Sequence, residues 1–326
     1  MENARTKNAD QPLVTMALLT YNSARSVVQS LAALQAQDYP NLEILVIDDA
    51  SKDDTVEVCR RQAGNDARVR IEQNPKNLGQ WGNYSLAAER SRGEFMCWAC
   101  PGDSWDPHYV STLVKRLQEV PGAIAVQSAV ERIDEYTRAH VKTHSMGGPH
   151  APDILNAWQR ARDSLRKVGE DVLRPRYSYF QHGLVSTNAL RKTFGAFPKP
   201  LLILNERTVV CHWALAGPLV TVKEPLIQRE LHEQPAHVRW QNDPWLRART
   251  SSRFYVSKVI WQIASSIVVT DLLPWQHKLL MPAIVANYWT RTMLHTGKIA
   301  AVLLLRRTVP SPAYSVLRRW YRVIRS

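Results

Sequence analysis

Apolar segments of strand length alternate with helical patterns through the first 130 residues of the chain. Continuous apolar runs predict strands buried on both faces, and between them apolar positions recur at helical spacing. In residues 23–37, for example, Val27, Leu31 and Leu34 share one helical face. This alternation predicts an α/β fold with a central, mostly parallel sheet covered on both faces. The predicted strands are residues 13–20, 42–49, 68–74, 94–100 and 122–130, and further helices are predicted from residue 51, at 80–90 and at 106–120.

The pattern changes in the second half of the chain. A polar, irregular stretch at 137–176 predicts a loop or a small helical insertion. After it we predict a strand at 179–186, a helix at 205–217 that Gly217 and Pro218 stop, and a strand with an edge segment at 218–231. From about residue 242 the chain reads as helical and basic. We therefore expect one domain at 12–235, with halves at 12–132 and 133–235, and a helical basic C-terminal extension at 242–326.

Polar side chains follow several predicted strands at the point where each strand ends. Since ligands bind beyond the carboxyl ends of strands in open parallel sheets, these clusters predict a ligand site at one sheet edge. Ser51 and Asp54 are spaced as a capping box for the next helix, which leaves Asp48 and Asp49 for another role. The residues after the first strand, "TYNSARS", contain no glycine, which excludes a G-x-G-x-x-G dinucleotide loop, and a Walker loop is also missing. The polar clusters are residues 20–22, 48–51, 74–77 and 100–103.

The positive charge of the chain is concentrated near its C-terminus. The net charge is +13, and thirteen Lys and Arg residues follow Asp243, against the single acid Asp271. A localised basic excess predicts an anionic partner for this tail. In residues 315–326, "SVLRRWYRVIRS", a helical face of Leu317, Trp320 and Ile324 lies opposite one of Arg318, Arg322 and Arg325. Such a helix suits an anionic membrane surface. The alternative is a helix packed on the domain with a solvated basic face, and no fold signature supports nucleic acid binding.

The cysteines and the N-terminal residues bear on possible metal, redox and targeting functions. Cys97 and Cys100 have Cys-x-x-Cys spacing, but no second Cys or His pair completes a zinc site. A redox dithiol is disfavoured because Cys97 lies inside a predicted buried strand. The polar N-terminus lacks the apolar core of a signal peptide, and no apolar run reaches the ~18 residues of a membrane span. We expect a cytoplasmic protein, peripheral at the inner face of the membrane.

Four motifs together resemble a family 2 glycosyltransferase of the GT-A fold. They are "VTMALLTYN", "EILVIDDASKDDT", "NPKNLGQWGNYSLAAERSRGEFMCW" and "DSWDPHYV", in the order and spacing of that family. The resemblance covers roughly residues 12–235. It implies a nucleotide-sugar-binding GT-A-like domain and an inverting glycosyltransferase activity.

The resemblance also implies site residues. Around the nucleotide base it implies Thr20, Asn22, Asp48 and Asp49, with Asp49 accepting from the base N3–H. Asn77, Gly79 and Asn83 match the segment that closes over the nucleotide. Glu206, counted back from Gly217, matches the carboxylate that deprotonates the acceptor, and Arg229 and His232 match an Arg-x-x-His pattern. Inverting transfer needs such a base opposite the leaving group, with charge or donors to hold the departing diphosphate.

The metal motif departs from the family pattern. Cys100 and Gly102 stand where the two carboxylates of D-x-D are expected, and Asp103 is the acid that follows them. Mg²⁺ and Mn²⁺ prefer hard oxygen ligands, which a thiol and a glycine do not supply. Three interpretations stay open. In the first, Asp103 holds a metal together with the diphosphate and waters. In the second, cationic side chains neutralise the diphosphate, and the candidates are Lys52, Arg207, Arg229 and His232. In the third, catalysis is lost and the fold is kept for binding or partner recognition.

Two functions follow from these observations. The first is transfer of a sugar from a nucleotide-diphosphate donor to a glycan or lipid-linked acceptor, as in cell-surface polysaccharide assembly. The second is a catalytically silent binding or scaffold protein of a glycan-assembly system.

Overall fold

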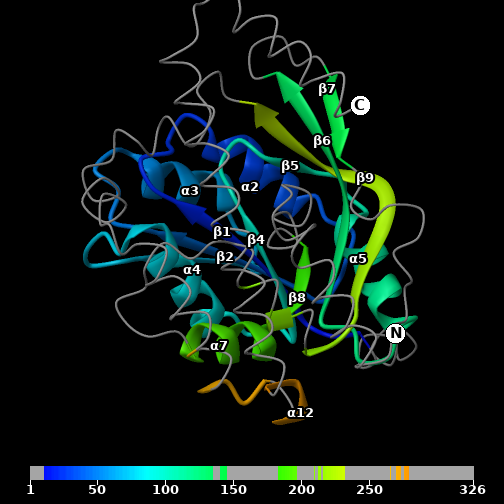
Figure 1. Ribbon diagram of the computed structural model, residues 1–326. Coiled ribbons are helices and arrows are strands. Elements are labelled where there is room, and N and C mark those ends of the chain that lie inside the picture. The colour runs from blue at the N-terminus through cyan, green and yellow to red at the C-terminus, as the bar shows by residue number, and fades with distance from the viewer. Residues whose placement is uncertain are drawn as a thin grey trace, which may run out of the picture.

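The protein is built around one nine-stranded sheet with helices on its faces (Figure 1). This computed structural model describes residues 11–134, 140–144, 183–196, 209, 212–213, 216–231, 265, 269–272 and 275–278. The strands are β1 Val14–Thr20, β2 Leu42–Asp48, β3 Val69–Gln73, β4 Phe95–Ala99, β5 Ser104–Trp105, β6 Ala125–Asp134, β7 His140–His144, β8 Leu184–Ser186 and β9 Leu219–Leu231. The helices are α2 Val27–Gln35, α3 Thr55–Ala63, α4 Gly79–Arg90, α5 Tyr109–Gln118, α7 Thr187–Ala196 and α12 Trp275–Lys278.

The sheet has a parallel half and a mixed half. The strand order is β3-β2-β1-β4-β8-β6-β9-β5, and β7 pairs with β6. Strands β3, β2, β1 and β4 are parallel to their neighbours, as the sequence predicts. Strand β8 is antiparallel to both β4 and β6, and β5 is antiparallel to β9. The α/β fold class predicted from the pattern is confirmed.

The helices divide between the two faces according to the direction of their crossovers. Helices α2 and α3 connect β1 to β2 and β2 to β3, and they pack together. Helix α4 connects β3 back to β4, in the opposite direction, so a right-handed crossover places it on the other face. There it packs against α7 (Figure 1). Strands β1 and β2 lie between these layers and are almost entirely buried, which explains their continuous apolar sequences.

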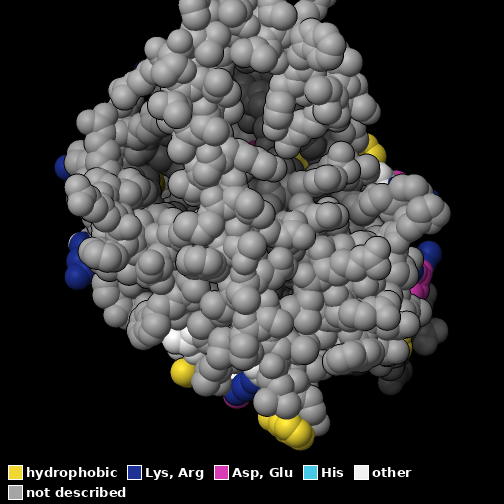
Figure 2. All heavy atoms as spheres, viewed as in Figure 1, with side chains coloured by type: hydrophobic (Ala, Val, Ile, Leu, Met, Phe, Trp, Pro, Cys, Tyr) yellow, Lys and Arg dark blue, Asp and Glu magenta, His cyan; other side chains and the backbone are white. Residues whose placement is uncertain are grey.

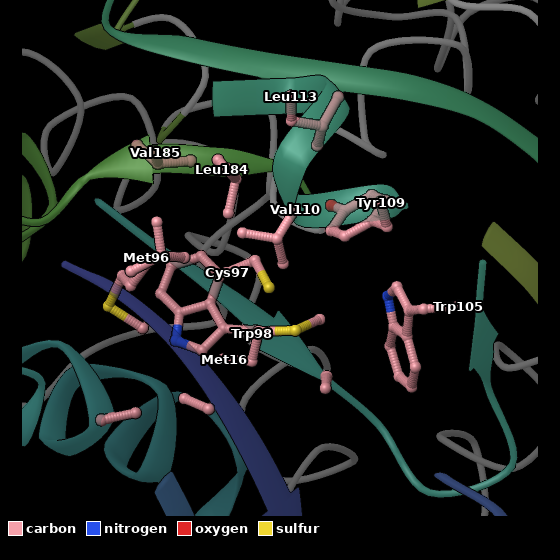
Figure 3. Close-up of a cluster of buried hydrophobic side chains, with 14 of the residues drawn as sticks. Met16, Met96, Cys97, Trp98, Trp105, Tyr109, Val110, Leu113, Leu184 and Val185 are labelled. Carbon is pink, nitrogen blue, oxygen red and sulfur yellow. The ribbon is translucent and has the colours of Figure 1, made fainter. Parts of the chain in front are cut away.

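Strand β4 contributes side chains to the core on both faces of the sheet. Cys97 lies among side chains of α5 and β8, including Val110 and Leu184 (Figure 3). The next residue, Trp98, makes edge contacts with Tyr84 of α4 and Phe194 of α7. Alternation along the strand thus ties the two helical layers to one short strand.

Two local predictions are wrong. Residues 137–176 are not all irregular, because His140–His144 form β7, which pairs with β6. Ser51 does not cap the following helix: α3 begins at Thr55 after Asp54, without a side-chain cap bond from Asp54. Instead the Ser51 hydroxyl donates to Asp48 and accepts from the Asn22 amide. The strand-end carboxylate is the stronger partner for this hydroxyl, since its bond is charge-assisted.

The C-terminal extension lies mostly outside the described residues. Within its described part, Leu272 packs against the core and Lys192 of α7 pairs with Asp271 at 3.2 Å. Figure 2 shows a group of hydrophobic side chains at the lower edge of the molecule, where Figure 1 has α12. Trp275 of this helix is 67% exposed. Among the described residues, we find no helix with the length and apolar character to cross a membrane. The amphipathic segment 315–326 is outside the described part.

Candidate functional site

The carboxyl ends of β1, β2 and β3 meet at one edge of the sheet, and polar side chains join them. Thr20 Oγ1 donates to Asp48 Oδ1 at 3.0 Å, and both residues are buried. The Asp48 carboxylate also accepts from the Ser51 amide and from Gln73 Nε2. Asp48 therefore fixes the turn after β2 and links three neighbouring strands.

Asp49 faces the start of α4. Its Oδ1 accepts from the Leu78 amide at 2.8 Å and from Asn74 Nδ2 at 2.9 Å, and its Oδ2 accepts from the Gly79 amide at 3.0 Å. The first amides of a helix lack intrahelical partners, and a carboxylate there satisfies them and complements the helix dipole. Asp49 thus caps α4 from a distant part of the chain, a role that sequence reasoning missed.

Three asparagines complete this network. Asn74 bridges Asp49 and the buried Asn83, whose Oδ1 accepts from Asn74 Nδ2 at 3.1 Å. Asn77 donates to the Asp49 carbonyl and accepts from the Gly79 amide. Of the residues expected around a nucleotide, the structure brings Asp49, Asn77, Gly79 and Asn83 into one connected group. Asn74 was noted in the sequence only as part of a polar cluster, and no spacing signal marks its bridging position.

Four residues at this edge have a left-handed backbone. They follow the ends of β1, β2 and β4 or begin α4: Asn22 (φ 48°), Ala50 (φ 60°), Gly102 (φ 94°) and Gly79 (φ 72°). Ala50 carries a Cβ in this region, which costs roughly 1–2 kcal/mol. Backbone strain of this kind concentrates at functional sites. Asn22 helps to hold the turns in place, because its Oδ1 accepts from the Lys52 amide at 2.9 Å.

The turn after β4 is held by α2. Ser30 Oγ accepts from the Gly102 amide at 2.9 Å and donates to the Asp103 carbonyl at 2.8 Å. Asp103, which is 5% exposed, follows directly. Ser30 sits on the apolar face of α2 beside Leu31 and Leu34, and its polarity at a buried position was the only sequence signal for this role.

Asp103 pairs with Arg229 across the sheet. Strands β5 and β9 align Trp105 with Ile227 and Ser104 with Gln228, so the next pair in this antiparallel register is Asp103 and Arg229. Arg229 Nε lies 3.2 Å from Asp103 Oδ2 and 3.3 Å from Oδ1. Burial acts to lower the pKa of Arg229, but Asp103, Cys100 and Tyr84 together outweigh it and the pKa is raised. Arg229 is therefore a fixed cation at the end of β4.

Tyr84 and Cys100 lie beside this ion pair. The Tyr84 hydroxyl is 3.8 Å from Cys100 Sγ. Burial, and then the neighbouring Cys100, raise the pKa of Tyr84 well above its usual value, so Tyr84 stays protonated. The structure thus assembles Tyr84, Cys100, Asp103 and Arg229 at the position where the family pattern has its D-x-D carboxylates. We refer to these four residues as the arginine cluster.

The Cys-x-x-Cys spacing does not form a dithiol. Cys97 and Cys100 are both thiols and form no disulfide with each other. Cys97 is fully buried in the apolar core, and this burial raises its pKa, which is opposite to what a reactive dithiol requires. The two side chains have different environments because Cys100 lies beyond the end of β4, in the turn.

A divalent metal does not fit the described residues of the arginine cluster. Its only carboxylate, Asp103, is paired with Arg229, and its neighbours offer a thiol and a phenol rather than hard oxygen ligands. In the described ranges no group of three or more His, Cys, Asp or Glu residues is placed to hold a metal ion. A second carboxylate at residue 102 would be strained, since Gly102 has a φ of 94°.

Two predicted site residues lie outside the described residues. They are Glu206, the expected base, and His232, the second member of the Arg-x-x-His pattern. His212, in the helical segment before Gly217, is described and fully buried, and burial lowers its pKa to about 4.

Comparison with known proteins agrees with this architecture. A sequence model of the family described as "Glycosyl transferase family 2" matches residues 16–184, a little over half of the chain. The chain is 28% identical over 124 residues to an uncharacterised glycosyltransferase of Haemophilus influenzae, covering 38% of each sequence. It is 30% identical over 110 residues to the GalNAc(5)-diNAcBac-PP-undecaprenol beta-1,3-glucosyltransferase of Campylobacter jejuni, covering 33% of this chain and 35% of that protein. The aligned part is thus little more than a third of these relatives.

Solved structures extend the likeness to most of the chain. TarS 1-349 of S. aureus in complex with UDP-GlcNAc superimposes with a TM-score of 0.61 at 17% identity, covering 92% of this chain and 76% of that one. The mannosyltransferase PcManGT of Pyrobaculum calidifontis, in complex with GDP-Man and Mn²⁺, superimposes with a TM-score of 0.58 at 18% identity, covering 97% and 81%. At these identities the likeness concerns the fold, which is the GT-A-like fold expected from the sequence.

A parallel half-sheet with polar strand ends, joined to a mixed half, defines a GT-A-like fold. The chain belongs to glycosyl transferase family 2.

Proposed function

We propose that the protein is an inverting glycosyltransferase that moves a sugar from a nucleoside-diphosphate donor to a glycan or lipid-linked acceptor. The observation that carries this proposal is the network at the ends of β1 to β3, within the segment that matches the family. Donors bind this edge in our proposal, with Thr20, Asn22, Asp48 and Asp49 around the base. The named relatives support it, since one acts on an undecaprenol-linked glycan by its name and two solved structures contain sugar nucleotides.

Asp49 has the chemistry for the proposed base contact. An ionised carboxylate has about four acceptor positions, and the three bonds to Asn74, Leu78 and Gly79 leave Oδ2 with a second lone pair. The base N3–H takes this position. Because the same carboxylate holds the start of α4, base binding and the order of Asn77 and Gly79 are coupled.

Glu206 is the proposed general base, acting on the acceptor hydroxyl. The experiment is a screen of UDP, GDP and their sugars by thermal shift, followed by a transfer assay with a lipid-linked or glycan acceptor. A bound donor raises the melting temperature. Glu206→Gln is expected to keep donor binding and to lose transfer, by at least about a hundredfold. Transfer at the wild-type rate in this variant contradicts the assignment.

The departure at residues 100 and 102 favours one alternative, a catalytically silent binding or scaffold protein. Donor binding without turnover, with any acceptor and with or without Mn²⁺, supports that alternative over the enzyme.

We further propose that the basic tail holds the protein at the cytoplasmic face of an anionic membrane. This proposal rests on the amphipathic pattern of residues 315–326 and on the lipid-linked substrate in the name of one relative. The protein's role would then lie in cell-surface polysaccharide assembly.

A further inference from the structure

We propose that this glycosyltransferase binds its donor without a divalent metal, with the Arg229 guanidinium, held by Asp103, neutralising the diphosphate. The inference rests on the proposed donor-binding function and concerns the same site. Its starting observation is that the arginine cluster occupies the place of the D-x-D carboxylates and does not suit a hard cation.

The charge balance of the arginine cluster equals that of a metal site. Two carboxylates with a divalent cation sum to zero, and so do Asp103 and Arg229. Both D-x-D carboxylates are replaced here, by Cys100 and Gly102, and the single carboxylate that remains, Asp103, is matched by one monovalent cation, Arg229. An isolated Arg229 at 24% side-chain exposure would be costly to desolvate, and Asp103 offsets that cost.

Guanidinium is a chemically suitable replacement for the metal. Arginine stays charged at all working pH values, and its planar set of donors matches phosphate oxygens. Its position is fixed by two independent features, the β5–β9 register and the contact from Arg229 Nε to Asp103. A preorganised cation at the departing phosphate stabilises the charge that develops during transfer. The protonated Tyr84 hydroxyl adds a neutral polar group beside it.

The turn after β4 favours Arg229 as the cation over a metal site with a second carboxylate at residue 102. Gly102 adopts a φ of 94°, and its amide is held by Ser30 Oγ. A carboxylate at residue 102 requires an unfavourable backbone conformation or loss of this bond. The missing D-x-D carboxylates and the geometry of the turn therefore both favour an arginine over a metal ion at this site.

The first experiment titrates UDP and GDP into the full chain by calorimetry, in excess EDTA and in excess Mn²⁺. We expect the same Kd in both within about twofold, because the cation is part of the protein. Binding that requires Mn²⁺, or that tightens more than about tenfold with it, overturns this inference but leaves the donor function standing. Failure of both nucleotides to bind under either condition overturns the donor function and this inference together.

The second experiment changes the arginine. Arg229→Gln is expected to weaken nucleotide binding by about 10- to 100-fold, equally with and without Mn²⁺, and Arg229→Lys by less. Arg61→Gln is the matched control, because Arg61 is exposed in the last turn of α3, toward the opposite edge of the sheet. Wild-type affinity in a folded Arg229→Gln protein overturns the inference, as does restoration of its binding by Mn²⁺.

A buried ion pair carries a risk of misfolding when one partner is removed. Asp103→Asn/Arg229→Gln removes both charges and keeps the pair neutral, so it is the folding-safe version of the same test. Circular dichroism and thermal melts establish folding for each variant. The EDTA and Mn²⁺ comparison on the unmodified protein decides the question even if every variant unfolds.

Discussion

Two adjacent aspartates at the end of β2, Asp48 and Asp49, have different structural roles. Asp48 is surrounded by Thr20, Ser51 and Gln73 and holds the turn, whereas Asp49 holds the start of α4. The alternation of side chains at a strand end directs neighbouring residues to opposite sides. In our proposal Asp49 contacts the base N3–H directly, and Asp48 supports that contact by holding the turn.

Replacement of Asp49 should destabilise the protein more than an ordinary helix-start change. Asp49→Asn turns part of an acceptor-only group into a donor facing two amides, and we expect a loss of about 2–3 kcal/mol in the free energy of unfolding, measured in urea. Asp54→Asn is the control, since Asp54 precedes α3 without a side-chain cap bond. Its expected loss is below about 0.5 kcal/mol. Equal losses in the two variants contradict the capping role of Asp49.

The buried His212 should make stability depend on pH. The folded protein keeps His212 neutral with a pKa of about 4, while an unfolded chain takes up the proton near pH 6.5. Stability is therefore complete above pH 6.5 and is lost as the pH falls toward 4. Between pH 7 and 5 the expected loss is about 2 kcal/mol.

His212→Leu tests this pH dependence because it removes the titrating group and keeps an apolar side chain in the core. Urea unfolding of wild type and variant is compared at pH 7 and pH 5. The variant is expected to lose about 2 kcal/mol less than wild type over this range. Parallel losses in the two proteins would show that other groups cause the pH effect.

At the scale of elements, α2 and the turn after β4 form one unit. Ser30 is a buried hydroxyl on an otherwise apolar helix face, and its three hydrogen bonds all go to backbone atoms of that turn. The helix therefore sets the position of Asp103, which in turn sets that of Arg229. This explains how a short strand of two residues, β5, keeps a defined register.

Ser30→Ala tests this connection. Removal of the Ser30 hydroxyl leaves the buried Gly102 amide without its acceptor, which costs about 1–3 kcal/mol in unfolding free energy. We also expect nucleotide affinity to fall by about tenfold, because the arginine cluster loses its support. Ser26→Ala is the matched control, since Ser26 starts the same helix without a side-chain cap bond. An unchanged affinity in a destabilised Ser30→Ala protein limits Ser30 to a structural role.

Sequence pattern predicts the elements well where the signal is local. The buried strands β1 and β2 and the face of α2 with Val27, Leu31 and Leu34 appear as expected. Strand β7 was missed because its five residues, "HVKTH", are polar and pair at the edge of β6. The strand-end clusters also converge on one edge of the sheet, since that follows from parallel topology alone.

The partners inside the site were much less predictable. Asp103 and Arg229 are 126 residues apart, and only the register of β5 on β9 brings them together. The same is true of Asp49 and the amides of Leu78 and Gly79, which depend on how α4 enters the sheet edge. Ser51 was assigned to the nearest helix because local spacing could not reveal Asp48 as its partner.

At the scale of the whole molecule, charge is divided between a balanced segment up to Asp243 and a basic tail after it. A surface that attracts anionic lipid adds binding energy through each Lys or Arg near the headgroups. Within the described part of this tail, Trp275 of α12 is an exposed hydrophobic side chain. Membrane contact would bring the donor site close to a lipid-linked acceptor.

The full chain should bind vesicles that contain phosphatidylglycerol, and binding should weaken as salt rises, because exposed charges are screened. Vesicles of phosphatidylcholine are the neutral comparison, and co-sedimentation is the measurement. A triple change of Arg318, Arg322 and Arg325 to Gln is expected to reduce binding at least about tenfold. The same triple change at Arg60, Arg61 and Lys115 is the charge-matched control. Equal binding by both triple variants places the membrane contact elsewhere.

The thiol of Cys100 offers a chemical route for labelling the proposed donor site. Cys59 and Cys97 are fully buried, while Cys100 is partly exposed beside Tyr84, next to the proposed donor. Where the family pattern has a carboxylate, which electrophiles do not alkylate readily, this chain has a nucleophile. A nucleotide analogue that carries a mild electrophile near its diphosphate could therefore form a covalent bond here and spare relatives with an intact motif. Mass spectrometry of the labelled protein, with Cys100→Ser as the comparison, reads out that selectivity directly.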